Sequence, residues 1–213
     1  MSYLVKELYH TLQGEGAQTG RAAVFCRFAG CNLWSGLERD RAEAACRFCD
    51  TDFRGTDGPG GGRFLDADAL ARVIRAAWDA ATVEGGRPYV VFTGGEPLLQ
   101  LDGALVEACH AHGLEVGVET NGTREPPPGL DWICVSPKAG APWVLRRGHE
   151  LKLVFPQPGL LPDQLGETAF DHCFLQPMDG AERVANTAAA AEWCLRHPRW
   201  RLSLQTHKLI GLP

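Results

Sequence analysis

The chain has 213 residues, of which 45% are hydrophobic and 22% are charged, a composition typical of a soluble globular domain. Lys and Arg number 21 against 26 Asp and Glu, so the formal net charge of −5 argues against broad nucleic-acid binding. No apolar run approaches the roughly 20 residues of a membrane span, and the N-terminal residues lack the apolar stretch of a signal peptide. We therefore expect a cytoplasmic protein with no membrane or nucleic-acid partner, whose eight cysteines stay mostly reduced.

Apolar, β-rich runs alternate with helical patterns along the chain. Strands are predicted at residues 24–29, 89–95, 114–122, 131–138, 150–156, 172–179 and 201–208. Helices are predicted at residues 66–81, with Asp66 as N-cap, at 98–112 and at 182–196, and a long loop spans about 30–62. Strand–helix–strand order implies parallel pairing, but the helices are too few for an eight-fold barrel. The pattern predicts one α/β domain over residues 1–213, folded as a partial TIM-like barrel of mostly parallel strands.

Polar residues and glycines gather where the predicted strands end. The sequences at these ends are GC, TGGEP, ETNG, SPK, QPMD and QTHK. Helix caps and turns account for any one of them. Because ligands bind at the carboxyl ends of parallel strands, six such ends at one rim indicate a binding site.

Three cysteines cluster in the long loop, where Cys31, Cys46 and Cys49 are spaced Cys-x14-Cys-x2-Cys. The other five are most simply small buried apolar residues: Cys26, Cys109, Cys134, Cys173 and Cys194. Three thiolates suit a structural zinc site, with His10, Asp50 or another cysteine as fourth ligand. They also suit a four-iron cluster with one iron free to bind the amine and carboxylate of S-adenosylmethionine. The spacing alone leaves both interpretations open.

The second predicted strand ends in Thr93-Gly94-Gly95-Glu96-Pro97. Glycines let the backbone approach a ligand closely, and free N–H and C=O groups at such an edge can bind an aminocarboxylate. The simpler interpretation is a tight turn with Pro97 at the start of a helix. In combination with the three-cysteine loop, however, this motif is highly specific.

The loop and the GGEP edge together resemble the radical S-adenosylmethionine superfamily, most of whose members have a shorter Cys-x3-Cys-x2-Cys loop. The long first gap, LQGEG at residues 12–16, CDT at 49–51 and QTHK at 205–208 are similar to the 7-carboxy-7-deazaguanine synthase family. The resemblance covers about residues 9–213. It implies conversion of 6-carboxy-5,6,7,8-tetrahydropterin to 7-carboxy-7-deazaguanine with loss of ammonia, on the route to 7-deazapurines such as queuosine.

The resemblance also implies roles for individual residues. Cys31, Cys46 and Cys49 would hold a 4Fe-4S cluster. Thr51 would bind Mg²⁺, although its simpler interpretation is a turn or N-cap hydroxyl. The residues implied for S-adenosylmethionine are Phe48, Cys49, Asp50, Gly95, Ser136, Pro137, Lys138, Gln176, Pro177, Met178 and Asp179. Those implied for the pterin are Leu12, Gln13, Gly14, Glu15, Arg27, Thr93, His207 and Pro213.

The chemistry of these side chains suits those roles. Glu15 can accept two N–H bonds from a guanidine-like edge. Arg27, on the same predicted strand face as Phe25, can grip a carboxylate, although it could equally form a surface ion pair. The family implies that the Pro213 carboxylate reaches the substrate. No amino-acid nucleophile is assigned, because the cofactor breaks the bonds; Lys138 and His207 are candidate proton carriers.

The resemblance further implies a flavodoxin or ferredoxin as electron donor and a homodimer, in which Trp143, Trp193 and Trp200 would serve either the interface or the core. Two alternatives remain open at this point. A glycyl-radical activating enzyme would act on a protein partner, but would give LQGEG and QTHK no role. A non-catalytic zinc-binding module would need only the cysteines.

Overall fold

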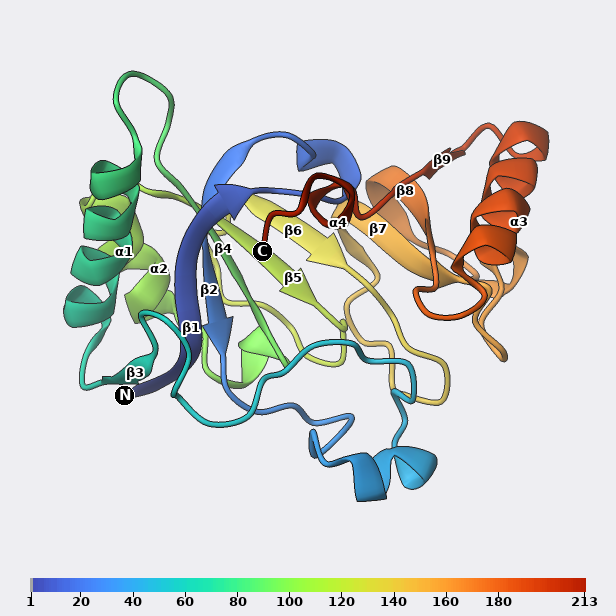
Figure 1. Ribbon diagram of the computed structural model, residues 1–213, viewed down its shortest axis with the longest axis horizontal. Coiled ribbons are helices and arrows are strands. Elements are labelled where there is room, and N and C mark those ends of the chain that lie inside the picture. Colours follow the sequence, from blue (N-terminus) through green and yellow to red (C-terminus); the bar gives the residue numbers. More distant parts are fainter. Residues whose placement is uncertain (1) are drawn as a thin grey trace.

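A nine-stranded sheet organises the chain in the computed structural model, which describes residues 2–213 (Figure 1). The strands are β1 (Tyr3–Leu12), β2 (Ala22–Phe28), β3 (Gly62–Phe64), β4 (Tyr89–Gly94), β5 (Glu115–Thr120), β6 (Trp132–Val135), β7 (Arg147–Phe155), β8 (Ala169–Pro177) and β9 (Trp200–Leu202). Their order in the sheet is β3-β1-β2-β4-β5-β6-β7-β8-β9. From β2 to β9 every pair is parallel, whereas β1 pairs antiparallel with β2 and β3. The sheet stays open between β3 and β9, which confirms the predicted partial barrel.

Three helices lie on the outer side of this sheet, with α1 (Ala67–Ala81) and α2 (Gly103–Ala111) near one end and α3 (Arg183–Arg196) near the other (Figure 1). The prediction for α1 is confirmed: the Asp66 side chain accepts a hydrogen bond from Ala69 N at 2.8 Å, and Leu70, Ile74 and Trp78 form its buried stripe. None of the helices within residues 2–213 has the length and apolar character needed to cross a bilayer.

Two predicted elements need correction. The helix predicted over residues 98–112 begins later, because Pro97–Leu99 form a 3₁₀ turn and Asp102 then caps α2 by accepting from Leu105 N at 3.0 Å. The strand predicted over 201–208 stops at Leu202, and α4 (Thr206–Ile210) follows. Both the backbone N and the hydroxyl of Thr206 donate to Gly14 O, at 2.9 and 3.0 Å, which holds the first turn of α4 in place.

Strand β1 was not predicted, because its alternation changes phase. Tyr3 and Val5 are buried, but a bulge between Val5 and Glu7 shifts the buried side to Leu8. Past the bulge, Glu7 and Tyr9 lie on the inner side of the sheet. Strand β3 is only three residues long, too short for a periodic signal.

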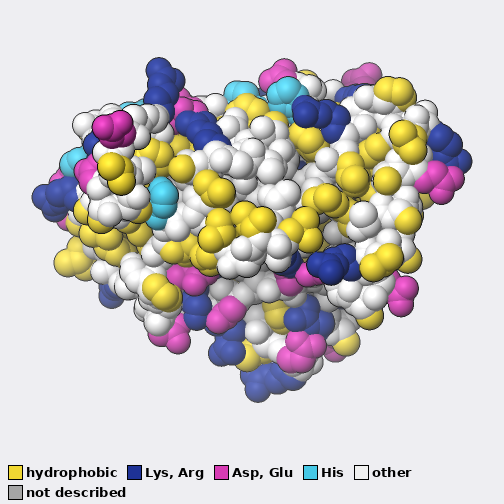
Figure 2. Space-filling model, turned by 45° about the horizontal axis from the view of Figure 1, so that its top comes forward, with side chains coloured by type: hydrophobic (Ala, Val, Ile, Leu, Met, Phe, Trp, Pro, Cys, Tyr) yellow, Lys and Arg dark blue, Asp and Glu magenta, His cyan; other side chains and the backbone are white. Residues whose placement is uncertain are grey.

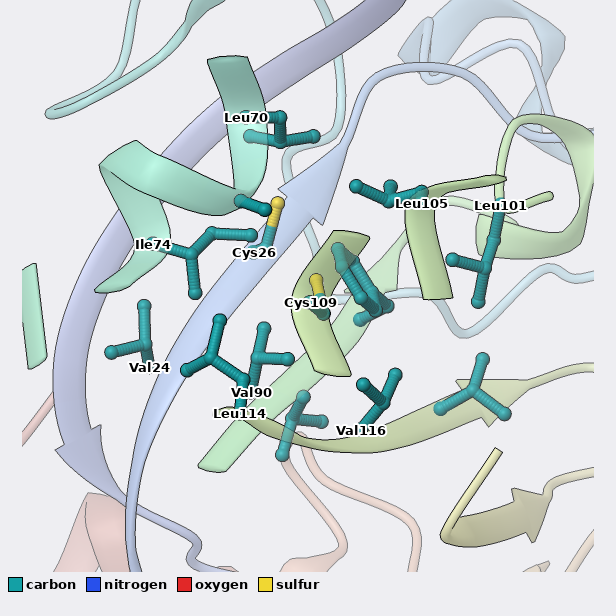
Figure 3. Close-up of a cluster of buried hydrophobic side chains, with 14 of the residues drawn as sticks. Val24, Cys26, Leu70, Ile74, Val90, Leu101, Leu105, Cys109, Leu114 and Val116 are labelled. Atoms are coloured by element: carbon teal, nitrogen blue, oxygen red, sulfur yellow. The ribbon is translucent and has the colours of Figure 1, made fainter. Parts of the chain in front are cut away.

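Apolar residues between the sheet and the helices form two buried clusters. The larger joins β1, β2, β4 and β5 to α1 and α2, where Val24, Val90 and Val116 meet Ile74 and Leu105 (Figure 3). The smaller joins β7 and β8 to α3 and β9. The five scattered cysteines are confirmed as apolar residues: four are buried and Cys194 is half-buried. Burial raises the pKa of Cys109 to about 12, as expected for an unreactive core thiol.

Candidate active site

The inner side of the sheet opens onto a cavity of about 490 Å³ at the carboxyl ends of the parallel strands. Its walls come from the loop after β2, the connection from β1 to β2, and the segment from Gln205 to Pro213 (Figure 1). The structure brings nearly all the residues singled out in the sequence into this one lining: Leu12, Gln13, Gly14, Glu15, Arg27, Cys31, Cys46, Phe48, Cys49, Asp50, Thr51, Thr93, Gly95, Ser136, Lys138, Gln176, Pro177, Met178, Asp179, His207 and Pro213. Pro137 lies outside the lining, where its carbonyl accepts a bond from Gln157 Nε2 at 3.4 Å.

Arg41 organises the long segment between the first two loop cysteines by binding backbone carbonyls further along the loop. The 3₁₀ turn η2 (Glu38–Glu43) carries Arg41, whose Nη1 donates to the carbonyls of Arg47 and Cys49 at 3.0 and 3.1 Å. The same guanidinium lies 4.0 Å from the ring centroid of Trp34. These contacts return the chain to the cavity, so that Cys46 and Cys49 face it together with Cys31.

The three thiols are polarised by local hydrogen bonds. Cys31 Sγ accepts from Leu33 N at 3.4 Å. A hydrogen bond with Cys46 lowers the pKa of Cys49 to about 6, and the same bond raises the pKa of Cys46. Burial raises the pKa of Cys31, so Cys49 is the thiol of this wall with the clearest thiolate character.

This arrangement fits a four-iron cluster. Among residues 2–213, no three His, Cys, Asp or Glu side chains converge on a site for a single metal ion. A cubic cluster instead spreads its thiolates over separate corners, so its cysteines need to face a shared space. Cys31, Cys46 and Cys49 do so, whereas the five other cysteines are absent from the lining.

The glycine edge after β4 packs directly on the start of the cysteine loop. A Cβ at Gly95 would lie 2.2 Å from Gly30 O and 2.7 Å from the Cβ of Cys31. Gly94 has φ +141°, and a Cβ there would lie 2.3 Å from Phe28 O. Only glycines allow this approach, which fixes Cys31 next to the carboxyl end of β4.

Glu96 ties this edge to the end of β5. Its carboxylate is fully buried and accepts from Leu98 N at 2.9 Å, Thr120 Oγ1 at 2.7 Å and Asn121 N at 2.8 Å. Burial raises its pKa, although these donors oppose the shift. Asn121 Nδ2 donates in turn to Asn32 Oδ1 at 3.0 Å, next to Cys31. Glu96 therefore stabilises the start of the cysteine loop indirectly, by positioning Asn121, which binds Asn32.

A ring of polar side chains lies on the opposite wall. Glu15 N donates to Gln13 Oε1 at 3.1 Å, and Gln13 Nε2 donates to Glu119 Oε1 at 2.8 Å. Lys152 Nζ donates to Glu119 Oε2 at 3.1 Å and to Glu15 Oε2, which closes the ring. Burial alone would raise the pKa of Glu15, but the charge of Lys152 and hydrogen bonds from Lys152, Gln205 and Gln176 together outweigh burial and lower that pKa to about 2.

Arg27 extends this polar wall from β2. Its Nε donates to Glu7 Oε1 at 2.7 Å and its Nη2 to the Tyr9 hydroxyl at 3.1 Å. Phe25 lines the cavity from the same strand face, as expected, and stacks on Tyr9 with ring centroids 5.9 Å apart. The ion pair considered for Arg27 exists, but it lies in the cavity wall.

The segment from Gln205 to Pro213 covers the cavity. Gln205 Nε2 donates to Glu15 Oε1 at 2.9 Å, and His207 packs so closely on Gly14 that a Cβ there would meet its ring. Lys208 Nζ donates to Asp50 Oδ2 at 2.8 Å and to Asp179 Oδ2 at 2.6 Å, which joins α4 to the cysteine loop and to the segment after β8. Thr11 Oγ1 donates to Pro213 O at 3.2 Å.

Two further predicted residues have clear local settings. No helix begins at Thr51 in the described chain, so the N-cap interpretation is wrong; its hydroxyl lies 3.5 Å from Asp50 Oδ1. Lys138 donates to the carbonyl and hydroxyl of Ser136 at 2.6 and 2.7 Å, and burial lowers its pKa.

The cavity lining also holds polar residues that sequence reasoning missed, among them Glu119, Lys152, Gln205 and Lys208. A signal existed for Lys152, which is a charged residue inside the apolar strand sequence ELKLVF. Glu119, Gln205 and Lys208 stand in ETNG and QTHK, two of the polar strand ends already noted.

Comparisons with known proteins agree with this geometry. A family model described as the radical SAM superfamily matches residues 41–146. The 7-carboxy-7-deazaguanine synthases of Bordetella pertussis and Bradyrhizobium diazoefficiens are 66% and 63% identical, with 100% of each chain covered. A crystal structure of QueE from Escherichia coli matches with a TM-score of 0.63 and 26% identity, over 96% of this chain and 94% of that one. The chain belongs to the 7-carboxy-7-deazaguanine synthase family of radical SAM enzymes.

Proposed function

We propose that this enzyme converts 6-carboxy-5,6,7,8-tetrahydropterin to 7-carboxy-7-deazaguanine with release of ammonia, on the route to queuosine and related 7-deazapurines. The observation that carries the proposal is one cavity with three loop thiols and a glycine edge on one wall and the Gln13–Glu15–Glu119–Lys152 ring on the other. The sequence identity of 66% and 63% to two 7-carboxy-7-deazaguanine synthases, over the full chain, favours this function over a glycyl-radical activating enzyme or a zinc-binding module.

Cys31, Cys46 and Cys49 would hold a 4Fe-4S cluster. When bound, the cluster and S-adenosylmethionine supply one-electron cleavage of a carbon–sulfur bond and abstraction of a hydrogen atom from carbon 6 of the pterin. The edge at Gly95 offers backbone groups to the methionyl end. The residues proposed to contact the rest of S-adenosylmethionine are Phe48, Cys49, Asp50, Ser136, Pro137, Lys138, Gln176, Pro177, Met178 and Asp179.

The other wall suits the pterin. Glu15, ionised because of Lys152, accepts N–H bonds from the guanidine-like edge, and Arg27 offers a guanidinium to the substrate carboxylate. Leu12, Gln13, Gly14, Thr93, His207 and Pro213 complete this proposed contact set. Thr51 supplies a hydroxyl to Mg²⁺, beside the Asp50 carboxylate.

The enzyme is further proposed to work in the cytoplasm as a homodimer reduced by flavodoxin or ferredoxin. Trp200 is buried, and the half-buried Trp143 and Trp193 pack against the smaller apolar cluster. Exposed apolar side chains occur instead on β9, on α4 and beside them: Leu202, Leu204, Leu209, Ile210 and Leu212. Hydrophobic side chains spread across the middle of the face that Figure 2 brings forward.

Anaerobic purification and turnover test the function. We expect a brown protein with about four irons per chain that converts the carboxytetrahydropterin in the presence of S-adenosylmethionine, reductant and Mg²⁺. Deuterium at carbon 6 should enter 5′-deoxyadenosine or S-adenosylmethionine. A colourless protein with stoichiometric zinc, or the absence of label transfer, would refute the proposal.

Single cysteine variants assign the ligands. Cys31→Ala, Cys46→Ala and Cys49→Ala should each lose most of the iron and turnover, because each removes one of only three protein ligands. Cys194→Ala is the matched control, since this half-buried thiol lies outside the cavity lining. Full iron content in any of the three loop variants would remove that cysteine from the ligand set.

A further inference from the structure

One buried cation connects most of the pterin-side wall. Lys152 lies in the middle of β7, between Leu151 and Leu153, which pack into the smaller apolar cluster on the outer side of the sheet. Its own side chain points inward and is only 5% exposed. Its Nζ donates to Glu15 on one side and to Glu119 on the other.

These contacts form a closed circuit through Gln13. Lys152 donates to the Glu119 carboxylate, which also accepts a hydrogen bond from the side-chain N–H of Gln13. The side-chain carbonyl of Gln13 accepts from the backbone N of Glu15, and the Glu15 carboxylate accepts from Lys152. The orientation of the Gln13 amide follows from this chain of donors and acceptors. Lys152 thereby fixes the direction of two side chains that the proposed function assigns to the substrate.

The circuit places two carboxylates, Glu15 and Glu119, beside the single ammonium of Lys152. Two carboxylates share one ammonium in a space that excludes most water, so Coulomb repulsion between them is strong without it. The other titratable groups with electrostatic influence on Lys152 or Glu119 are Glu150, Cys134, Lys138, Tyr9 and Tyr89. Glu150 is occupied elsewhere, since it accepts from Ala17 N at 3.0 Å and from Cys134 Sγ at 3.4 Å.

We infer that Lys152 is a positioning residue for the pterin: it holds the Glu15 and Glu119 carboxylates side by side and sets the orientation of Glu15 and Gln13. This inference rests on the proposed function for the identity of the substrate. Burial by itself would lower the pKa of Lys152, but the surrounding acidic groups raise it, so the ammonium stays charged at working pH. The pKa of Glu15 is lowered to about 2, so Glu15 is also ionised at working pH.

Lys152→Met keeps the length of the side chain and removes the charge. Without the ammonium, one of the two carboxyls binds a proton at neutral pH, because two unpaired carboxylates in one enclosed space repel each other. That carboxyl then loses an acceptor for the substrate. We expect the KM for the pterin to rise roughly 10- to 100-fold, as for loss of a hydrogen bond to a charged group. The Kd of S-adenosylmethionine should stay unchanged.

The pH dependence separates this role from a structural one. In the wild type, pterin affinity should be flat between about pH 6 and 8, because Glu15 stays ionised throughout. In Lys152→Met it should fall as the pH drops through the raised carboxyl pKa. The double variant Lys152→Met/Glu119→Gln removes the repelling charge as well, so it should recover part of the affinity and lose the pH dependence.

A spectroscopic readout stands apart from turnover. Infrared spectra of the cluster-loaded Lys152→Met protein at neutral pH should show a carboxylic-acid carbonyl band that is absent in the wild type and in the double variant. Arg21→Met is the matched control: it removes another partly buried cation, paired with Glu115 at 2.7 Å, but one outside the main cavity. It should show neither the band nor the pH-dependent KM.

The outcomes are distinguishable. A wild type that does not convert the pterin, together with the infrared band in Lys152→Met, would refute the proposed function and leave the electrostatic role intact. Pterin KM, pH profile and infrared spectrum that all match the wild type would overturn the inference. Equal losses of pterin and S-adenosylmethionine affinity, unrelieved by Glu119→Gln, would also overturn it by showing general disruption.

Discussion

At position 95 the backbone of one strand end touches the backbone that precedes the first loop cysteine, with no room for a methyl group between them. At this contact Gly95, the proposed binding position for the methionyl end of S-adenosylmethionine, packs against Gly30 and Cys31 at the start of the proposed cluster loop. Hydrogen bonds reinforce it, since Glu96 N donates to Gly30 O at 3.0 Å. A change of one carbon atom here should therefore disturb two binding functions at once.

Gly95→Ala should lower the free energy of unfolding by about 1–3 kcal/mol, because a rigid backbone carbonyl must move to admit the new Cβ. Iron retention and S-adenosylmethionine affinity should fall together. Gly103→Ala is the control, since a Cβ at the start of α2 meets no atom within 4 Å. Chemical denaturation and iron analysis measure the effects; a Gly95→Ala protein as stable and as iron-rich as the control would contradict the argument.

Individual residues were predictable from sequence to very different degrees. Cysteines and glycines in a spaced motif keep their meaning without tertiary information, and all of those singled out line the cavity. Lys152 and Glu119 acquire their roles only by meeting Glu15 and Gln13, which lie 137 and 106 residues away in the sequence. No local pattern encodes such a meeting.

At the scale of elements, helix α4 is tied to its neighbours by a clasp, the two ion pairs of Lys208 with Asp50 and Asp179. Among the ion pairs of residues 2–213, only those of Lys208 join α4 to both the cysteine loop and the segment after β8, and its side chain is about one-third exposed. Burial opposes its charge, but Asp179 and Asp50 raise its pKa. The clasp therefore stays charged at neutral pH and weakens with added salt.

Lys208→Ala should free the last turn of the chain from the cavity. We expect faster amide exchange in residues 206–212 and a KM for the pterin raised about three- to tenfold, in keeping with partly exposed ion pairs. Arg196→Ala, which breaks the Arg196–Glu192 pair on the surface of α3, should leave both unchanged. Exchange rates and KM identical to the wild type would show that α4 needs no clasp.

Elements with uninterrupted periodicity were predicted, and those shaped by distant partners were not. The buried parallel strands and α1 follow from runs of apolar residues and one capping aspartate. The bulge in β1 hides its alternation, and α4 depends on the Gly14 carbonyl at the other end of the sequence. In both cases the deciding interaction is tertiary.

At the scale of the whole molecule, the sheet has two free edges, at β3 and β9, and the β9 side also carries exposed leucines. An open barrel leaves such edges to be covered by another chain or by charge. The proposed homodimer would bury this apolar surface.

Leu209→Glu should therefore shift the protein toward a monomer, because a carboxylate in an apolar interface must be desolvated without a partner. Light scattering after size-exclusion chromatography measures the mass. Val83→Glu is the control, since Val83 is 99% exposed in the connection after α1. A dimer mass retained by the Leu209→Glu variant would place the interface elsewhere, and a monomeric wild type would reject the dimer.

The bond between Gly14 and Thr206 spans 192 residues, which has a consequence for the time course of folding. Contacts of such large sequence separation are slow to form, whereas the three loop cysteines lie within a short segment that can fold early. We expect the cavity to stay unroofed until the final stage of maturation. Iron and sulfide can then be delivered to the thiols before the lid closes.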